Sequence, residues 1–290
     1  MSITVDNAVI MAAGTSSRFA PLSYEKPKAL TLVKGEVLIE RQIRQLRDAG
    51  IDEILLICGY KKEKLDYLAG KFGVEIIDNP DHLTRNNNSS IWAVKERLGN
   101  TYICSSDNYF AENPFEKDVS SAYYAAVYAD GPTAEWCLTE DEEGFIDSVT
   151  IGGRDAWYML GHAFWDREFS SRFVKILEGI YDLPETAGKL WEAIYMDHLD
   201  ELKLKLRRYP SDMIFEFDTL DELRSFDVSY ENDTRSAIIK GIAARLGIEE
   251  RNIRNAQAIK RGSNEACGFS FTAAGRHYEY YYDTEELRSI

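Results

Sequence analysis

A loop near the N-terminus combines small residues with basic side chains. It begins with Ala12-Ala13-Gly14-Thr15-Ser16-Ser17, continues through Arg18 and ends in Lys26-Pro27-Lys28. Small residues let backbone N–H groups approach phosphate oxygens closely, and Arg and Lys side chains neutralise phosphate charge. An isolated loop with one glycine would more simply be a surface turn. The composition of the whole loop instead predicts a cradle for the phosphates of a nucleotide.

Two aspartates follow apolar segments that have the character of strands. Asp107 comes after Thr101 to Ser105, and Asp218 comes after Ile214 to Phe217. Two carboxylates facing a triphosphate suit Mg²⁺, which prefers oxygen ligands and takes others from water and phosphate. A single aspartate at a strand end is more often a cap or turn residue, and Asp218 before Thr219 also fits a helix cap.

The segments that carry these residues alternate short apolar strands with amphipathic helices. This alternation predicts an α/β fold with a mostly parallel, mixed sheet flanked by helices. In such folds ligands bind beyond the carboxyl ends of the strands, where Gly14, Gly59 and Asp107 are expected to meet. Strands are predicted at residues 8–13, 54–58, 74–77 and 101–105, and helices at 37–49, 62–70 and 89–98.

The pattern changes twice further along the chain. A β-rich insertion on the substrate side is predicted at about residues 120–166, followed by helices over 167–199 and a strand at 203–209. Beyond residue 228 a helix over 234–246, ended by Gly247, precedes strands around an Ala274-Gly275 turn. We therefore expect a catalytic domain over residues 1–228 and a small α+β element over 229–290.

Composition excludes several classes of partner. The formal net charge of the 290 residues is -15, which disfavours binding to nucleic acid or to an anionic membrane surface. The N-terminal residues do not resemble a signal peptide, and no apolar run is long enough to span a bilayer. The four cysteines are widely spaced and are expected to be reduced. These features predict a cytoplasmic protein.

The phosphate loop resembles a known signature. The string from Ala12 to Lys28 is similar to A-A-G-x-G-x-R-x-x-P-x-T followed by P-K, the motif of the sugar-phosphate nucleotidylyltransferase superfamily. Ser16 and Ser23 replace the second glycine and the threonine of that motif. Within the superfamily, residues 7–225 resemble bacterial CTP:phosphocholine cytidylyltransferases of the LicC type. The strings that carry this resemblance are Ile57-Cys58-Gly59-Tyr60, Asn86-Asn87-Asn88-Ser89-Ser90, Ser106-Asp107-Asn108-Tyr109, Glu135-Trp136, Gly161-His162-Ala163-Phe164-Trp165-Asp166 and Ile214-Phe215-Glu216-Phe217-Asp218.

The resemblance implies a Rossmann-like nucleotidyltransferase fold and Mg²⁺-assisted transfer of CMP from CTP to phosphocholine. Lys28 is expected on the α-phosphate, Arg18 on the departing pyrophosphate, and Asp107 and Asp218 on the metal. No side-chain nucleophile is required, because a phosphate monoester is already ionised near neutral pH. The residues expected to bind the nucleotide are Ala12, Ala13, Gly14, Thr15, Ser16, Ser17, Gly59, Tyr60, Asn87, Ser90 and Ser106.

A quaternary ammonium group is bound by aromatic faces together with a carboxylate. By resemblance, such a cage would contain Tyr109, Trp136, Tyr195 and Glu216. The alternative is that these aromatic residues belong to the core, and for Tyr195 the two alternatives are equally open. His162 and His198 lack partners at catalytic spacing and are expected to be structural.

Other functions remain open at this stage. The acceptor could be 2-aminoethylphosphonate or a sugar 1-phosphate, or the protein could be an inactive nucleotide-binding sensor or assembly subunit. Residues 253–282 faintly resemble the opening strands of choline-kinase-like proteins. We expect the C-terminal element to serve in packing or in a homodimer, with Tyr278, Tyr280, Tyr281 and Tyr282 supplying contact surface.

Overall fold

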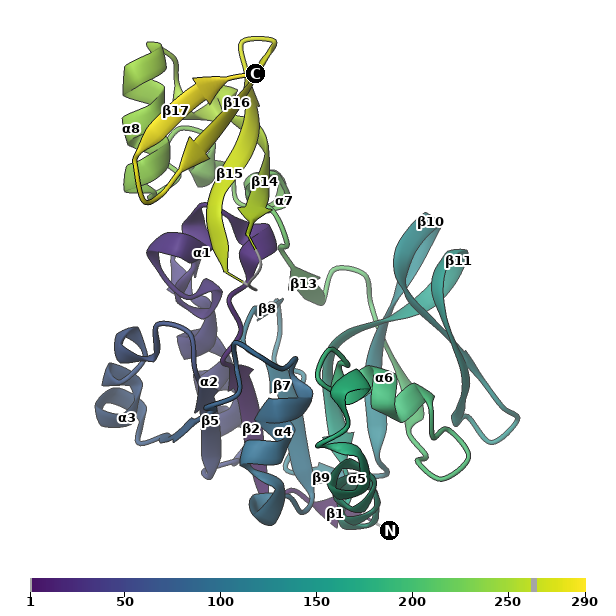
Figure 1. The fold of residues 1–290 in the computed structure, drawn as a ribbon. Coiled ribbons are helices and arrows are strands. Elements are labelled where there is room, and N and C mark those ends of the chain that lie inside the picture. The colour runs from purple at the N-terminus through teal and green to yellow at the C-terminus, as the bar shows by residue number, and fades with distance from the viewer. Residues whose placement is uncertain (1, 262–264) are drawn as a thin grey trace. The chain divides into compact units, whose positions relative to one another are not determined.

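The computed structural model describes residues 2–261 and 265–290, and their backbone forms two compact units (Figure 1). The first unit contains the chain up to Gly14 and Leu38–Glu216, and the second contains Thr15–Val37 and Phe217–Ile290. This division differs from the boundary at residue 228 expected from the sequence. The difference arises because the loop segment Thr15–Val37 packs with the C-terminal chain. A catalytic domain extending over residues 1–228 stays a prediction.

A seven-stranded sheet is the centre of the first unit, in the order β12-β10-β11-β7-β2-β5-β6. Strands β7, β2, β5 and β6 are mutually parallel, β12 is parallel to β10, and only β11 runs antiparallel to its neighbours. The prediction of a mostly parallel, mixed sheet is therefore confirmed. The strands are β2 (Asn7–Ala12), β5 (Ile54–Cys58), β6 (Glu75–Asp78), β7 (Thr101–Ser105), β10 (Tyr123–Glu140), β11 (Ile146–Trp165) and β12 (Lys205–Tyr209).

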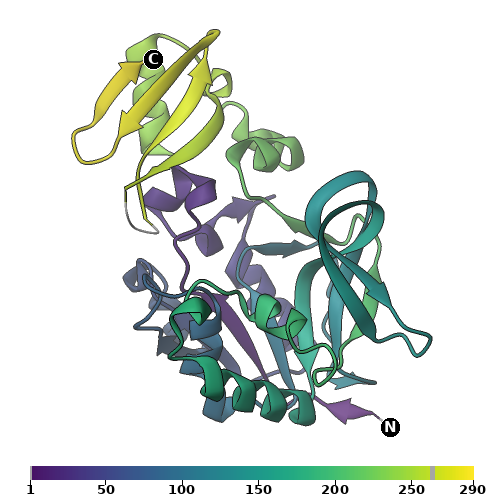
Figure 2. The same ribbon diagram turned by 45° about the vertical axis from the view of Figure 1, so that its right-hand side comes forward.

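Helices flank this sheet. Val9, Leu55 and Ile57 of the strands join a core with apolar residues of α4, α5 and α6. Figure 2 shows α5 crossing the strands on the same side as α6. No helix in the described part of the chain is long and apolar enough to cross a membrane. The helices of this unit are α2 (Leu38–Asp48), η3 (Lys62–Lys64), α3 (Tyr67–Phe72), α4 (Asn88–Ala93), η4 (Lys95–Arg97), α5 (Arg167–Ile180), η5 (Pro184–Thr186) and α6 (Trp191–Met196).

Two predicted helices are shorter than expected. The helix predicted over residues 89–98 is divided into α4 and the 3₁₀ turn η4, because Val94 leaves helical geometry with φ -120° and ψ 11°. The helix predicted over 62–70 is likewise divided into η3 and α3. Local apolar spacing identifies these helical segments but does not reveal a single residue that interrupts them.

The predicted β-rich insertion is one long hairpin. Strands β10 and β11 pair from Tyr123 opposite Phe164 out to Glu140 opposite Ile146, with several register shifts. Cys137 pairs both with Thr150 and with Tyr158, so the outer end of the hairpin curls back against its own base. Bulges bend strands and increase their twist, which explains the curl. Short strand pairs complete the unit, namely β1 (Ile3–Thr4) with β9 (Asp118–Val119), and β8 (Asn108–Phe110) with β13 (Ile214–Glu216).

The second unit contains a four-stranded antiparallel sheet in the order β14-β15-β16-β17. Ala274 and Gly275 both have positive φ, so the predicted turn joins β15 and β16 as expected. Helix α8 begins after its cap Ser236, three residues later than predicted, and ends at left-handed Gly247 as predicted. Residues 262–264 of the predicted β region lie outside the described residues. The elements are η1 (Ser17–Phe19), α1 (Leu22–Glu25), η2 (Lys28–Leu30), β3 (Leu32–Val33), β4 (Glu36–Val37), α7 (Leu220–Phe226), η6 (Val228–Tyr230), α8 (Ala237–Leu246), η7 (Glu250–Asn252), β14 (Arg254–Lys260), β15 (Ala266–Ala273), β16 (Arg276–Tyr281) and β17 (Glu286–Ser289).

The tyrosines near the C-terminus lie inside this unit. Tyr278, Tyr280, Tyr281 and Tyr282 are each at most 9% exposed. Three of them, Tyr278, Tyr280 and Tyr282, pack with apolar residues of α8 and β15 in one core. They therefore serve packing, and the expectation that they supply contact surface for a partner was wrong. A homodimer through this element stays a prediction, and the four buried tyrosines do not support it.

Candidate active site

The second unit brings two predicted catalytic cations to one carboxylate. Arg18 Nη1 lies 2.6 Å from Asp218 Oδ2, and Lys28 Nζ lies 3.5 Å from Asp218 Oδ1. The Arg18 side chain is 77% exposed, whereas that of Lys28 is only 4% exposed. Lys28 therefore has a fixed position beside Asp218, and Arg18 has the freedom to meet a ligand.

The loop before Arg18 depends on an unusual backbone conformation. Ser16 has φ 45° and ψ 44°, in the left-handed region, and begins the 3₁₀ turn η1. This is the position where the superfamily signature has glycine, which adopts such a conformation without steric cost. For a serine the cost is about 1–2 kcal/mol. The loop thus keeps the conformation that glycine would favour despite the substitution.

Thr219, and not Asp218, caps helix α7. Thr219 Oγ1 accepts a hydrogen bond from the Glu222 N–H at 3.2 Å, and Glu222 Oε2 accepts from the Thr219 N–H at 2.9 Å. Glu222 Oε2 also accepts from the Asp218 N–H at 2.7 Å. This capping box satisfies the helix start, so the Asp218 carboxylate is left to pair with cations. The cap alternative raised by the sequence does not hold for the Asp218 side chain.

In the first unit, three predicted nucleotide-binding loops share one edge of the sheet. They follow β2, β5 and β7, which are adjacent and parallel. Ala12 and Ala13 end the first of these strands and are buried. The Tyr60 N–H donates to Ala13 O at 3.0 Å and so ties two of the loops together. Ser106 and Asp107 occupy the turn after β7.

Gly59 has a steric reason to be glycine. A Cβ at this position would come within 2.5 Å of the His82 ring, far inside normal contact distance. The His82 ring is itself fixed, because its Nδ1 lies 2.8 Å from Asn79 O. Any side chain at residue 59 would displace this loop at the carboxyl end of β5.

Asn87 and Ser90 make specific contacts within the protein. Asn87 Oδ1 accepts from the Trp191 N–H at 2.7 Å, and its Nδ2 donates to Glu192 Oε2 at 3.1 Å. Ser90 Oγ accepts from Asn79 Nδ2 at 3.2 Å and is nearly buried. Both residues thus hold the start of α4 in place, and their direct contact with a nucleotide stays a prediction.

The predicted cage residues divide into two groups. Tyr109 and Glu216 lie on the paired strands β8 and β13, and Trp136 lies on β10 and packs against the main core. Tyr195, by contrast, is 0% exposed within that core, with its ring centroid 6.0 Å from that of Phe169. It presents no face to a ligand, so the assignment of Tyr195 to the cage is corrected to the core.

The structure adds three residues to this region that were not predicted, namely Tyr124, Tyr158 and Glu192. Glu192 Oε1 accepts from the Tyr124 hydroxyl at 3.3 Å. Burial raises the pKa of Tyr124 well above its usual value, and the charges of Glu192 and Glu216 raise it further. Burial, followed by the charges of Glu135 and Glu216, also raises the pKa of Tyr158. Glu192 therefore contacts the Tyr124 phenol, and the charge of Glu216 acts on the phenols of both Tyr124 and Tyr158.

Glu192 is a carboxylate whose pKa is raised by burial. It is only partly exposed, and desolvation raises its pKa from 4.5 to about 7 despite hydrogen bonds from Asn87 and Tyr124. The aromatic rings of Tyr124 and Trp191 stack beside it, with centroids 5.6 Å apart. A cation entering this region would restore its charged form. Only its place next to Trp191 distinguishes Glu192 in the sequence.

His162 is structural, as its isolation in the sequence indicates. It is 1% exposed, and its Nε2 lies 2.8 Å from the Tyr123 hydroxyl oxygen. Burial lowers the pKa of His162 to about 3, so the ring is neutral. It packs among Phe110, Phe115 and Tyr209.

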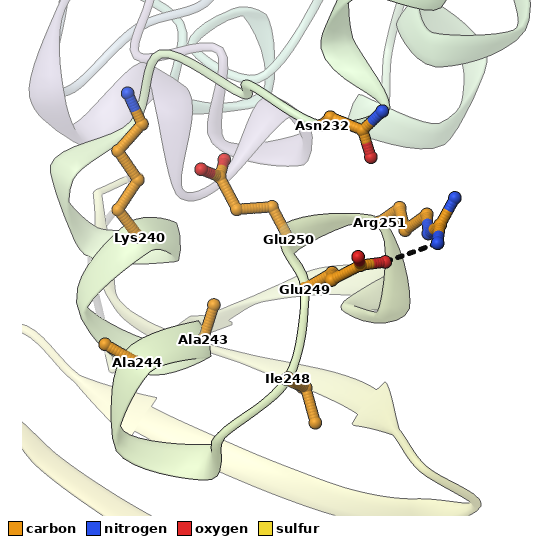
Figure 3. A pocket seen from close by; sticks show the side chains of 8 residues that line it. All are labelled: Asn232, Lys240, Ala243, Ala244, Ile248, Glu249, Glu250 and Arg251. Carbon is orange, nitrogen blue, oxygen red and sulfur yellow. Dashed lines mark ion pairs between the residues drawn. The ribbon is translucent and has the colours of Figure 1, made fainter.

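A hollow of about 530 Å³ lies apart from these residues, between α8 and η7 (Figure 3). Its charged groups are engaged with one another or with adjacent residues. Arg251 pairs with Glu249 at 2.5 Å, and Lys240 pairs with Asp233 at 2.8 Å. Glu250 Oε2 accepts from the N–H of Thr234 at 2.7 Å. The hollow contains none of the predicted site residues.

Comparison with known proteins agrees with this fold. Residues 8–134 match the family of MobA-like NTP transferase domains. The chain is 31% identical over 226 residues to the choline-phosphate cytidylyltransferase of Streptococcus pneumoniae (strain ATCC BAA-255 / R6). This alignment covers 78% of this chain and 99% of that protein. It is 32% identical over 228 residues to a 2-aminoethylphosphonate cytidylyltransferase of Lancefieldella rimae, covering 77% and 93% respectively. The solved structure of the Streptococcus pneumoniae CTP:phosphocholine cytidylyltransferase, LicC, matches with a TM-score of 0.74 and 33% identity, covering 77% of this chain and 97% of that one.

The match over residues 8–134 and the 31% identical relative, which covers 78% of the chain, identify this chain as a nucleotidyltransferase. The chain belongs to the family of LicC-type choline-phosphate cytidylyltransferases. The resemblance predicted from the sequence motifs is thereby confirmed.

Proposed function

We propose that this enzyme transfers CMP from CTP to phosphocholine and releases CDP-choline and pyrophosphate. The observation that carries the proposal is the 31% identity over 226 residues to the choline-phosphate cytidylyltransferase of Streptococcus pneumoniae, and Glu192, which accepts a hydrogen bond from the Tyr124 hydroxyl at 3.3 Å, is a supporting carboxylate. A quaternary ammonium offers no hydrogen-bond donor, so aromatic faces and nearby negative charge are the groups that recognise it. A sugar would instead require more amide and hydroxyl partners. The streptococcal relative is named for the same reaction.

The chemistry requires positioning and charge rather than a side-chain nucleophile. An oxygen of the acceptor phosphate forms a bond to the α-phosphorus of CTP, and the bond to pyrophosphate breaks. Lys28, held beside Asp218, neutralises charge on the α-phosphate and on the incoming phosphate. Arg18, which is largely exposed, follows the departing pyrophosphate.

The residues present suit a divalent metal, which we propose to be Mg²⁺. Asp218, which faces Arg18 and Lys28, would supply one carboxylate oxygen, and the family resemblance gives the same role to Asp107. Carboxylate oxygens fit Mg²⁺, which takes its other ligands from water and from the phosphates of the substrate. The bound ion would neutralise the charge of the triphosphate.

A second acceptor is supported by a specific observation. Glu192 and Glu216 can also accept hydrogen bonds from a primary ammonium group, and a 32% identical relative is named for 2-aminoethylphosphonate. We therefore propose this phosphonate as the alternative acceptor. As further proposals, we place the enzyme in the cytoplasm, with no nucleic-acid or membrane partner, and leave open a homodimer through the C-terminal element.

The proposed function is tested by pyrophosphate release with CTP and Mg²⁺. Four acceptors are compared: phosphocholine, phosphoethanolamine, 2-aminoethylphosphonate and glucose 1-phosphate. We expect the highest kcat/KM with phosphocholine. Preference for 2-aminoethylphosphonate would establish the alternative, and preference for glucose 1-phosphate would reject the cage. Binding of CTP without turnover of any acceptor would indicate a nucleotide-binding sensor.

Glu192 predicts a pH dependence of acceptor binding. Its carboxyl has a pKa of about 7 before the cation binds, so below that pH binding must first expel a proton. The KM for phosphocholine should therefore rise as the pH falls through 7, by about tenfold between pH 8 and pH 6. Glu192→Gln should raise this KM at pH 8 and abolish the part of the pH dependence that Glu192 contributes.

The acceptor phosphate also titrates in this pH range and contributes to the profile of every variant. The contribution of Glu192 is therefore the difference between the profiles of the wild type and Glu192→Gln. Glu142→Gln, in an exposed turn of the hairpin, is the matched control and should keep the wild-type profile. The KM for CTP should change little in Glu192→Gln. Identical phosphocholine profiles for the wild type and Glu192→Gln would remove Glu192 from the cation site.

A further inference from the structure

The segment that carries Arg18 and Lys28 packs against the C-terminal element. Ala20 joins the core formed by α8 and the four-stranded sheet. Tyr24 stacks face to face on Tyr282, with ring centroids 3.7 Å apart and planes at 10°. Tyr282 directly follows β16, so this contact joins α1 to the sheet.

A carboxylate from the same segment binds the start of α8. Glu25 Oε1 accepts from the backbone N–H of Ala237 at 2.7 Å and from that of Ile238 at 3.4 Å. These N–H groups have no acceptor within the helix, and a negative charge is favourable at a helix N-terminus. Glu25 therefore completes the capping that Ser236 begins.

The far end of the segment is also anchored. Leu32 O accepts from the Tyr230 hydroxyl at 2.6 Å, and the Lys34 N–H donates to Asp227 Oδ2 at 2.8 Å. Lys28 lies between these contacts and those of Tyr24 and Glu25. The phosphate-binding segment is thus fixed on both sides of its catalytic lysine.

Helix α7, which begins just after Asp218, is attached to the same element by Arg224. This side chain is 1% exposed and donates to Ile253 O at 2.6 Å and to Glu250 O at 2.8 Å. It also pairs with Asp221 in the first turn of α7 at 3.1 Å. The carboxylate and the two cations that face it are therefore anchored to one framework.

We propose that residues 229–290 act as an intramolecular brace that fixes Arg18 and Lys28 relative to Asp218, with Tyr24 and Glu25 as positioning residues. This inference rests on the proposed function for its kinetic consequence, but the brace itself is a property of the fold. The streptococcal relative matches 78% of this chain over 99% of its own length, so the family reaction does not require a chain of this length. In this chain, residues 229–290 would order the loop that carries Arg18 and Lys28.

The ligand-independent test is hydrogen exchange of the backbone amides in residues 15–34. Tyr24→Ala removes the ring that stacks on Tyr282 at a position that is 37% exposed, so the fold should tolerate it. We expect exchange about two- to tenfold faster in this segment, because a stacked aromatic pair contributes that range of stabilisation. Tyr24→Phe should restore wild-type exchange. Lys240→Ala, which removes an exposed ion pair on α8, is the control and should leave the segment unchanged.

The kinetic test separates positioning from general destabilisation. Tyr24→Ala should raise the KM for CTP as well as lower kcat, so that kcat/KM for CTP falls by up to about 100-fold, because the cations that it misplaces bind the phosphates of CTP. A partly unfolded enzyme would instead lose kcat with both KM values unchanged. Glu25→Ala should act in the same direction as Tyr24→Ala.

The outcomes for the brace and for the proposed function are distinguishable. Unchanged exchange in residues 15–34 for both Tyr24→Ala and Glu25→Ala would overturn the brace, whatever the acceptor. Faster exchange with unchanged kcat/KM for CTP would overturn the positioning role. Absence of turnover in the wild type would reject the proposed function, and the exchange data would still decide whether the brace exists.

Discussion

Lys28→Met is expected to lower kcat by about 10²- to 10³-fold, the usual effect of removing one preorganised group that stabilises transition-state charge. Methionine keeps the unbranched apolar stem that lies near Phe19, whose ring centroid is 5.8 Å from Lys28 Nζ. Asp218 keeps its ion pair with Arg18, so no carboxylate is stranded. The loss should therefore appear in catalysis and not in stability.

Steady-state kinetics and thermal unfolding of the same preparations check this prediction. Lys34→Met is the matched control, since Lys34 also lies over an aromatic ring of the second unit, with its Nζ 4.3 Å from the Phe226 centroid. That control should keep wild-type kcat. A kcat for Lys28→Met within a fewfold of wild type would exclude Lys28 from contact with the reacting phosphates.

Asp107→Asn should abolish measurable turnover, with a loss of about 10³-fold or more. The change keeps the size of the side chain but removes the charge on which a divalent ion depends, and such an ion supplies several kcal/mol of charge stabilisation. Asp107 lies in the turn after β7, at the edge where the loops of β2 and β5 also end. The fold should be retained, because the turn itself is preserved.

The measurement is kcat over a range of Mg²⁺ concentrations, with circular dichroism as the check on folding. Asp118→Asn is the control, because its carboxylate binds only the Thr4 hydroxyl at 2.7 Å on an exposed strand pair. Substantial activity of Asp107→Asn at ordinary Mg²⁺ concentrations would remove Asp107 from the metal site and leave Asp218 as the predicted ligand.

The elements of the nucleotide site could be predicted from the sequence because their causes are local. Apolar runs that end in Gly14, Gly59 and Asp107 indicate parallel strands, and the ends of neighbouring parallel strands meet at one edge. The end of helix α8 is likewise determined by a local signal, the capping residue Gly247. These features need no knowledge of distant residues.

The remaining features depend on contacts that no local pattern encodes. Glu192 acquires its raised pKa only because Tyr124 and Trp191 surround it, and those neighbours come from a strand and a helix. Tyr195 has the composition of a cage residue, but the packing of α6 directs it into the core. The attachment of the phosphate loop to the C-terminal element depends on the Tyr24 and Tyr282 rings, which are far apart in the chain.

The curled hairpin of β10 and β11 has a consequence for solubility. Cys137 pairs with Thr150 on one side and Tyr158 on the other, and Leu138 pairs with both Val149 and Trp157. At these positions both edges of β10 are paired with residues of β11. Exposed strand edges are the usual templates for pairing between molecules. The hairpin can therefore extend eighteen residues along β10 while Cys137 and Leu138, near its outer end, remain closed to the strand addition that leads to aggregation.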